Sequence, residues 1–211
     1  MSENGIVKDI YSYDGNGNRC GTDIRKGLVF DHTEYIYDVN REHAQVLEET
    51  SACGCEKAVY DYSLVRDSAE INGITYNYLY DGRGSVSELT GNCGTTLCTY
   101  SYDIYGNVSS SNKLTGNPYT YNGEYTDSDT GYQYLRARYY DPETHMFITR
   151  DKYQGNIMQP ITENAYRYCG NDPMNYADPS GYFFEQIIGY LKSTFNAWKQ
   201  GFINVNKGKN F

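Results

Sequence analysis

The sequence predicts a mainly β protein in which antiparallel hairpins pair into one continuing sheet. Three observations lead to this prediction: the tyrosine content, a recurring Tyr-x-Tyr-Asp motif, and the turn-forming residues that follow it. Of 211 residues, 25 are tyrosine and 21 are glycine, whereas only 5 are proline. Tyrosine favours pleated, half-buried surfaces, and glycine favours the tight turns that join strands. The expected core is therefore aromatic and β-built.

The motif recurs about every 19 to 24 residues along the first 126 residues. Its copies are YSYDGNGN at 11–18, YIYDVNRE at 35–42, VYDYS at 59–63, YLYDGRGS at 78–85, YSYDIYGN at 100–107 and YTYNGEYT at 119–126. Tyrosines two positions apart lie on the same face of a strand, and the Asp, Gly or Asn after them forms a tight turn. Because a single hairpin is marginal in water, about six such hairpins are expected to pair edge to edge over residues 1–130.

Two segments of different character follow the repeats. Residues 131–182 are expected to form a looped cap with short strands, because Gly, Asn and Pro recur closely towards its end. Residues 183–211 predict an amphipathic helix, because apolar side chains recur every three or four positions. These side chains are Phe184, Ile188, Leu191, Phe195, Trp198 and Phe202. The helix is expected to cover the open face or edge of the sheet, or else to begin a toxin region or lie on a membrane surface.

The net charge of −9 is unevenly distributed, because residues 183–211 carry four lysines and one glutamate. The remaining body is strongly acidic, and nucleic acid is not its expected partner, since phosphate binding needs clustered basic residues. The first residues lack a basic segment followed by an apolar core, and no apolar run approaches the roughly 20 residues of a membrane span. The protein is therefore expected to be secreted or surface-exposed by a non-classical route, or cytoplasmic before export.

The cysteines allow two interpretations. Cys53, Cys55, Cys93 and Cys98 could contribute to a metal site, but their CxC and Cx4C spacings differ from paired zinc knuckles. Buried free thiols or incidental disulfides explain them better. No metal and no cofactor is expected.

Several stretches together resemble the Rhs, or YD-repeat, proteins and their Rhs-associated core. They are YLYDGRGSVSELT, TYSYDIYGNV, YTYNGEYTDSDTGYQYLRARYYDPETHMFITRD and NAYRYCGNDPMNYADPSGY. This family includes the C components of insecticidal toxin complexes. The resemblance covers nearly the whole chain and implies a curved sheet that, in full-length relatives, spirals into a hollow shell around a C-terminal toxin polypeptide. The chain is accordingly expected to be an open fragment of such a shell, with the toxin polypeptide or its remnant and the remaining shell as partners.

In several relatives the core is also an aspartic self-protease that cuts just past an Asp-Pro-x-Gly motif. The resemblance implies Arg150, Asp151 and Asp178 as catalytic residues and a scissile bond after Tyr182. Two neighbouring carboxylates do not both ionise, so one can act as an acid while the other activates water. Arg150 could polarise the scissile carbonyl or keep Asp151 ionised. Lys152 departs from the family pattern, which usually has proline there.

The alternative for Asp141, Asp172 and Asp178 is that each starts an Asp-Pro turn and accepts local backbone N–H bonds. The expected function is a structural scaffold that encapsulates or presents a toxin in bacterial competition or pathogenicity. A single-turnover aspartic autoprotease is the second hypothesis. A surface glycan-binding module is the third, supported by exposed aromatic side chains.

Overall fold

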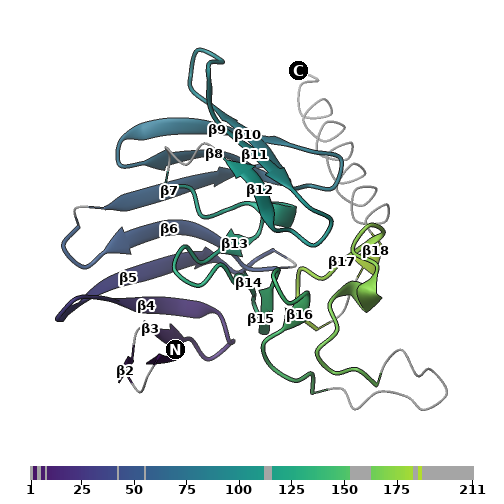
Figure 1. Cartoon of the computed structure of the whole chain (residues 1–211). Helices are drawn as coiled ribbons and strands as arrows, with labels where there is room; N and C mark the ends of the chain where they lie inside the picture. The colour runs from purple at the N-terminus through teal and green to yellow at the C-terminus, as the bar shows by residue number, and fades with distance from the viewer. Residues whose placement is uncertain are drawn as a thin grey trace, which may run out of the picture.

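The largest element of the protein, in the computed structural model of Figure 1, is a ten-stranded antiparallel sheet. The structure describes residues 9–41, 43–54, 56–109, 116–152 and 163–182, and the backbone of 2–3, 6–7, 110–111 and 185–186. The strands lie in sequence order, so each pairs with the next along the chain, and the predicted continuous antiparallel sheet is confirmed. They are β3 (Asp9–Tyr13), β4 (Arg19–Lys26), β5 (Val29–Asp38), β6 (Gln45–Ser51), β7 (Lys57–Tyr62), β8 (Arg66–Ile71), β9 (Ile74–Tyr80), β10 (Val86–Thr90), β11 (Thr96–Tyr102) and β12 (Val108–Ser111).

Smaller elements precede and follow this sheet. A four-stranded antiparallel sheet contains β13 (Tyr125–Thr126), β14 (Gln133–Leu135), β15 (Arg138–Asp141) and β16 (Met146–Phe147). Two-stranded sheets pair β1 (Ser2–Glu3) with β2 (Ile6–Val7), and β17 (Tyr176–Ala177) with β18 (Glu185–Gln186). Short 3-10 turns occur at η1 (Tyr121–Gly123) and η3 (Cys169–Asn171). No described helix is long and apolar enough to cross a membrane. The helix predicted over 183–211 is wrong at residues 185–186, which form β18, and the rest of that range lies outside the described residues.

The tyrosine pairs of the first five motifs lie on one face of the large sheet, called here the inner face. The pairs are 11 and 13, 35 and 37, 60 and 62, 78 and 80, and 100 and 102. Cross-strand pairing places them on one side: Tyr35 is opposite Glu49, which is opposite Ala58, and Tyr60 is opposite Ala69. Burial follows the same alternation, and the buried core of the sheet is mostly tyrosine with Val, Leu and Ala. The predicted strand-period aromatic core is confirmed.

The residues that follow three of the tyrosine pairs form the same type of turn. Oδ1 of Asp103 accepts backbone N–H bonds from Tyr105 and Asn107 at 2.8 and 3.0 Å, and Gly106 has a φ of +96°. The same bonds recur in the turns that begin at Asp14 and Asp81. Aspartate therefore satisfies two N–H groups of the turn, and the glycine three residues later adopts the positive φ that it requires.

This turn makes stability depend on pH in the acid range. Hydrogen bonds from Asn18 hold the pKa of Asp14 below its usual range. At Asp103 burial would raise the pKa, but hydrogen bonds from Asn107, Tyr105 and Gly106 together lower it. A folded-state pKa below the unfolded value of about 3.9 stabilises the fold above that pH, and the contribution is lost as pH falls through the folded pKa. Urea denaturation across this range is expected to show a smaller acid loss for the double variant Asp14→Asn, Asp103→Asn than for the wild type. An equal loss in both proteins would contradict this role of the turns.

The second tyrosine of a pair ties its hairpin to the preceding one. The hydroxyls of Tyr62, Tyr80 and Tyr102 donate to the carbonyl oxygens of Val46, Arg66 and Val86, at 2.8, 2.7 and 2.7 Å. A register shift also occurs at or opposite the second tyrosine of all five pairs. Such bulges bend a strand and increase its twist. The repeat therefore encodes both the curvature of the sheet and the bond that joins neighbouring hairpins.

Removing one of these hydroxyls is expected to destabilise the sheet. Phenylalanine at Tyr62, Tyr80 or Tyr102 should lower the free energy of unfolding by about 1 kcal/mol, because a carbonyl loses its donor. Tyr37→Phe is the matched control, because the hydroxyl of Tyr37 has no hydrogen-bond partner in the described part of the chain; it should cost less than about 0.5 kcal/mol. Urea denaturation measures all four variants, and equal losses would refute the tie.

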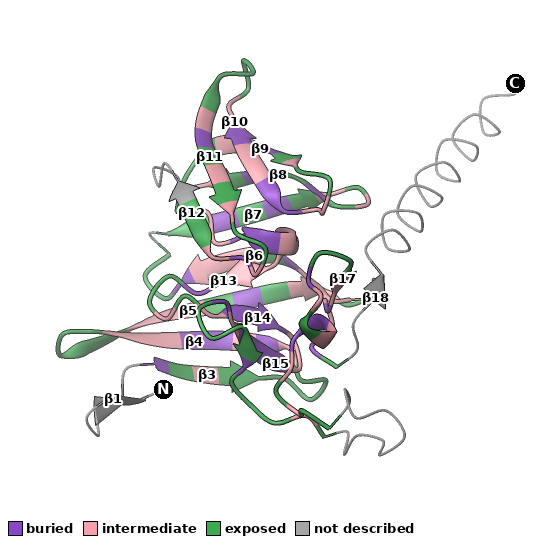
Figure 2. Ribbon diagram, turned by 45° about the vertical axis from the view of Figure 1, so that its right-hand side comes forward, coloured by how far each residue is buried: buried purple, intermediate pink, exposed green. Residues whose placement is uncertain are grey.

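The sixth predicted hairpin does not extend the large sheet. The chain instead crosses the inner face after β12, as Figures 1 and 2 show for β13 and β14. The rings of Tyr119, Tyr121 and Tyr125 pack against those of Tyr60, Tyr102 and Tyr35, with centroid distances of 5.0, 5.8 and 6.3 Å. Crossing buries rings that a further hairpin at the edge would leave half exposed. The predicted boundary between residues 130 and 131 falls in the turn between β13 and β14.

Two buried arginines join this crossing segment to the sheet. The guanidinium carbon of Arg66 lies 3.2 Å from the ring centroid of Tyr119, and that of Arg19 lies 4.1 Å from the centroid of Tyr125. The backbone N–H of Arg19 also donates to the hydroxyl of Tyr134 at 3.0 Å. A desolvated cation–π contact contributes about 2 kcal/mol. The crossing segment and the sheet are therefore expected to unfold together.

Candidate functional site

The hairpin tip between β14 and β15 holds three consecutive backbone carbonyls of the Asp-Pro-Ser-Gly segment. Arg136 Nη1 donates to the carbonyl oxygen of Pro179, the backbone N–H of Ala137 donates to that of Ser180 at 3.3 Å, and Arg138 Nε donates to that of Gly181. The three acceptors are backbone carbonyl oxygens. The bonds therefore fix the backbone path of residues 179–181 and do not depend on the side chains of these residues. We call residues 136–138 the clamp.

The conformation of the clamp depends on a partner in the crossing segment. Arg136 has a φ of +56°, which is uncommon for a residue other than glycine. Its Nη1 lies 3.0 and 3.1 Å from the two carboxylate oxygens of Glu124. This half-buried ion pair holds the guanidinium over Pro179 and stabilises the strained turn.

Gly181 is required by its contact with the clamp. A Cβ there would lie 2.3 Å from the carbonyl oxygen of Leu135 and 2.9 Å from the backbone nitrogen of Arg138, and the φ of Gly181 is +71°. Both the close approach and the positive φ exclude an ordinary side chain. The glycine of the Asp-Pro-Ser-Gly motif therefore allows the segment to lie against the hairpin.

Arg138 brings the two predicted catalytic aspartates together. Its Nη1 lies 3.0 Å from Asp151 Oδ2, and its Nη2 lies 3.7 Å from Asp178 Oδ2. The side chain is 7% exposed and its guanidinium carbon lies 3.6 Å from the ring centroid of Phe147. Burial lowers the pKa of Arg138, against the opposing effect of both aspartates. An arginine stays protonated in proteins, so it balances one of the two carboxylates.

Asp178 also forms the predicted turn. Its Oδ1 accepts the backbone N–H of Gly181 at 2.8 Å and the hydroxyl of Ser180 at 3.1 Å. The backbone N–H of Tyr182 in turn donates to Ser180 Oγ at 3.1 Å. One carboxylate oxygen of Asp178 therefore shapes the turn, while the other faces Arg138. Asp141 and Asp172 have local partners in their own turns.

A cavity of about 330 Å³ adjoins this cluster. Arg138, Thr149 and Tyr182 line one side, and the turn between β3 and β4 lines the other. The cavity has room for water beside the position predicted for the scissile bond. Two carboxyl groups that share a proton are the groups with which aspartates hydrolyse peptides, and here Arg138 lies between the two.

The other predicted site residue has a different environment. Arg150 is exposed, and the arginine between the two aspartates is Arg138. The sequence Leu-Arg-Ala-Arg contains both clamp arginines, but neither was assigned a role from sequence, because their function depends on a segment about 43 residues away. All three residues of β14 and the first three of β15 are buried, so no alternation of buried and exposed positions in these strands marked Arg138.

Within the described residues, no group of three or more His, Cys, Asp or Glu side chains could hold a metal ion. Cys55 of the considered cysteine set lies outside these residues, whereas Cys20, Cys93, Cys98 and Cys169 are free thiols. Burial raises the pKa of the Cys169 thiol well above its usual range. A buried, protonated thiol is inert, as expected for a packing role.

Comparison with known proteins finds relatives among toxins, although no protein-family model matches the chain. The chain is 33% identical over 186 residues to the tRNA3(Ser)-specific nuclease WapA of Bacillus spizizenii; this match covers 84% of the chain and 8% of that protein. It is 30% identical over 178 residues to double-stranded DNA deaminase toxin A of Burkholderia cenocepacia, covering 82% of the chain and 12% of that protein. The chain therefore spans only a small part of the length of these relatives.

Solved structures of toxin complexes share the fold. The crystal structure of TcdB2-TccC3 without the hypervariable C-terminal region matches with a TM-score of 0.62 and 18% identity over 86% of this chain and 9% of that chain. The crystal structure of TcdB2-TccC3-Cdc42 matches with a TM-score of 0.61 and 16% identity over 90% of this chain and 9% of that chain. TccC3 contains Rhs repeats, so the mostly antiparallel fold of this chain is Rhs-related.

Proposed function

We propose that the chain is the C-terminal part of a bacterial toxin scaffold of the Rhs type, which encapsulates or presents a toxin polypeptide that follows it. The observation that carries this proposal is the clamp. It fixes residues 179–181 through three successive carbonyl bonds, so any polypeptide beyond Tyr182 starts from a defined place on the scaffold. The similarity to nuclease and deaminase toxins and to TccC3 supports the same function. In this proposal residues 131–182 act as the cap, and export follows a non-classical route.

The size of the sheet implies a further partner. Ten strands at about 4.8 Å each span roughly 45 Å, which is too narrow to close around a folded toxin. The proposal therefore includes the rest of an Rhs shell, of which this chain supplies one end.

Retention of a tethered polypeptide tests the scaffold function. A reporter polypeptide is joined after Phe211 through a site for a sequence-specific protease, and the linker is cut under native conditions. The reporter is expected to co-elute with the chain in size-exclusion chromatography, because contacts with the inner face hold it even though this chain alone does not enclose it. The same reporter joined to an unrelated β protein of equal net charge is the control. A reporter that leaves both proteins to the same extent would refute the scaffold function.

A second candidate function is single-turnover aspartic self-cleavage after Tyr182. The observation that favours it is the convergence of Asp151 and Asp178 on Arg138 beside the Asp-Pro-Ser-Gly segment. We assign Arg138 the role of keeping one aspartate ionised, so that this carboxylate activates water while the protonated aspartate donates to the leaving amide. Its test is the intact mass of the chain beside aspartate variants.

A further inference from the structure

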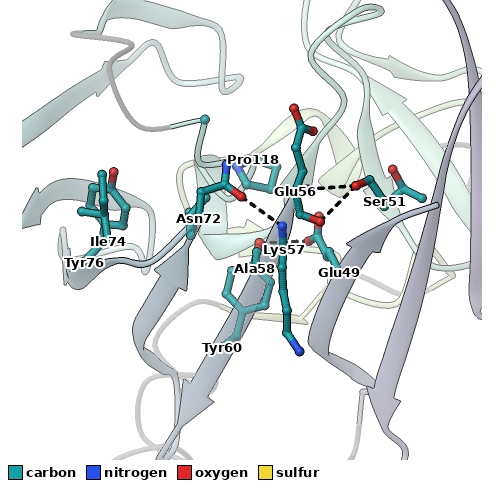
Figure 3. A pocket seen from close by; sticks show the side chains of 13 residues that line it. Glu49, Ser51, Glu56, Lys57, Ala58, Tyr60, Asn72, Ile74, Tyr76 and Pro118 are labelled. Atoms are coloured by element: carbon teal, nitrogen blue, oxygen red, sulfur yellow. Dashed lines mark hydrogen bonds between the residues drawn. The ribbon is translucent and has the colours of Figure 1, made fainter. Parts of the chain in front are cut away.

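A second cavity, of about 430 Å³, opens on the inner face of the sheet, and its lining residues, shown in Figure 3, do not include the clamp. It lies over β5 to β9 beside Gly116 and Pro118, and its volume is in the range typical of ligand pockets. Ala58 creates the space, because this small residue takes an inner-face position between Glu49 on β6 and Ile71 on β8. The cavity is therefore encoded by one alanine in a face otherwise rich in tyrosine.

The polar end of this cavity is acidic. Glu49 Oε1 accepts hydroxyl bonds from Tyr60 at 3.0 Å and Tyr119 at 3.2 Å, and burial raises the pKa of Glu49. Glu56 lies at the exposed rim. Lys57 is the basic residue among the described wall residues, but its Nζ lies 2.9 Å from Glu48, which belongs to the outer face of the sheet. Among the described lining residues, no basic side chain is directed into the cavity. Arg19 and Arg66, which do not line it, attract the Glu49 carboxylate and oppose the effect of burial on its pKa.

The walls of the cavity are aromatic and aliphatic. Tyr60 and Tyr76 are both buried and line it together with Ile71 and Ile74. Figure 3 shows Glu49 and Tyr60 at one end and Ile74 and Tyr76 at the other. A carboxylate next to tyrosine rings suits a cation on an aliphatic stem, because the rings attract the charge and the walls bury the stem.

We propose that this cavity binds a lysine side chain of the cargo polypeptide, with Glu49 as the counter-ion of its ammonium group, the ring of Tyr60 beside that group, and Ile74 and Tyr76 along the stem. That the lysine belongs to cargo rests on the proposed scaffold function, because the cavity opens on the face that would enclose cargo. The acidic body of the chain favours the approach of a basic polypeptide in the same way. The cavity thus gives the scaffold a preference for cargo charge without a preference for cargo fold.

Methyl NMR of Ile71 and Ile74 tests the site. The probe is the end-blocked tripeptide Gly-Lys-Gly, and the matched probe replaces lysine by norleucine, which has a similar stem without the charge. The lysine peptide is expected to give saturable shifts, and the norleucine peptide should bind at least tenfold more weakly. Glu49→Gln should raise the Kd of the lysine peptide at least tenfold, whereas Glu70→Gln, on the exposed outer face of β8, should change it less than twofold.

The Ala58→Leu variant tests whether binding needs the space of the cavity as well as the charge of Glu49. It keeps Glu49 but fills the space, and it is expected to abolish binding in a protein whose remaining spectrum shows the native fold. Equal binding of the two peptides, or an unchanged Kd in Glu49→Gln, would overturn the lysine site. If the tethered reporter is still retained in that case, the scaffold function stands and only the site is refuted.

Discussion

Asparagine in place of Asp151 or Asp178 is expected to keep the chain at its full mass of 24.1 kDa under conditions in which the wild-type chain is cut after Tyr182. The amide cannot exchange the proton that the reaction moves, and removal of general acid–base catalysis costs roughly a hundredfold or more in rate. Denaturing intact-mass measurements over time follow the reaction. The Arg138→Met variant should be slowed as well, because the two carboxylates then lose the guanidinium that lies between them.

Two control variants make this prediction specific. Asp141→Asn changes an aspartate whose contacts are local, to the backbone N–H of Glu143 and the hydroxyl of Thr144, and it should be cut like the wild type. Arg150→Ala should also be cut, because Arg138 is the arginine placed between the aspartates. Cleavage of Asp151→Asn at the wild-type rate, or a wild-type chain that stays whole, would assign both aspartates to turn formation and packing alone.

Arg66→Ala is expected to lower the free energy of unfolding by about 3–5 kcal/mol, the largest stability loss predicted for this chain. Arg66 is 4% exposed, with its guanidinium over the ring of Tyr119 and hydrogen bonds to the hydroxyl of Tyr62 and the carbonyl of Gly123. Truncation removes the cation from four surrounding rings, leaves these groups without a donor and opens a cavity. Because domains are stable by only about 5–15 kcal/mol, much of the protein should be unfolded by mild denaturant.

A second substitution distinguishes the charge of Arg66 from its volume. Arg66→Met fills most of the space without a charge, and it should recover part of the loss, since apolar residues can replace buried charges. Arg25→Ala is the surface control, with a local bond to the carbonyl of Gly27, and should cost less than about 0.5 kcal/mol. Urea denaturation gives all three values. A loss below 1 kcal/mol for Arg66→Ala would show that the crossing segment is held by tyrosine packing alone.

The sequence predicted those parts of the fold that depend on local chemistry. The tyrosine pairs and the Asp-x-x-Gly turns act within one hairpin or between neighbouring hairpins, so a continuous sheet of hairpins could be predicted from their spacing. The departure of the sixth motif could not be derived in this way. It depends on whether Tyr119 and Tyr121 bury more surface at the sheet edge or across the inner face. That difference is set by contacts with residues far away in the sequence, which the local pattern does not contain.

The residues of the candidate site also fall into those that the sequence predicted and those that it did not. The resemblance to Rhs cores selected Asp151 and Asp178, and the structure brings both to one guanidinium. Arg138 was missed because its partners lie 13 and 40 residues further along the chain. The cavity at Ala58 was missed because an alanine in a strand does not by itself predict a cavity. The space exists only because Glu49 and Ile71 lie opposite Ala58 on neighbouring strands.

Site-specific photo-cross-linking to the retained reporter tests the scaffold function most directly. A photoreactive residue replaces either Thr33 or Glu34, which are neighbours on β5 but point to opposite faces of the sheet; Thr33 lines the inner-face cavity, and Glu34 is exposed. If the inner face holds cargo, the cross-link yield from position 33 should exceed that from position 34 at least tenfold. Equal yields, or a higher yield from position 34, would contradict a cargo-holding inner face.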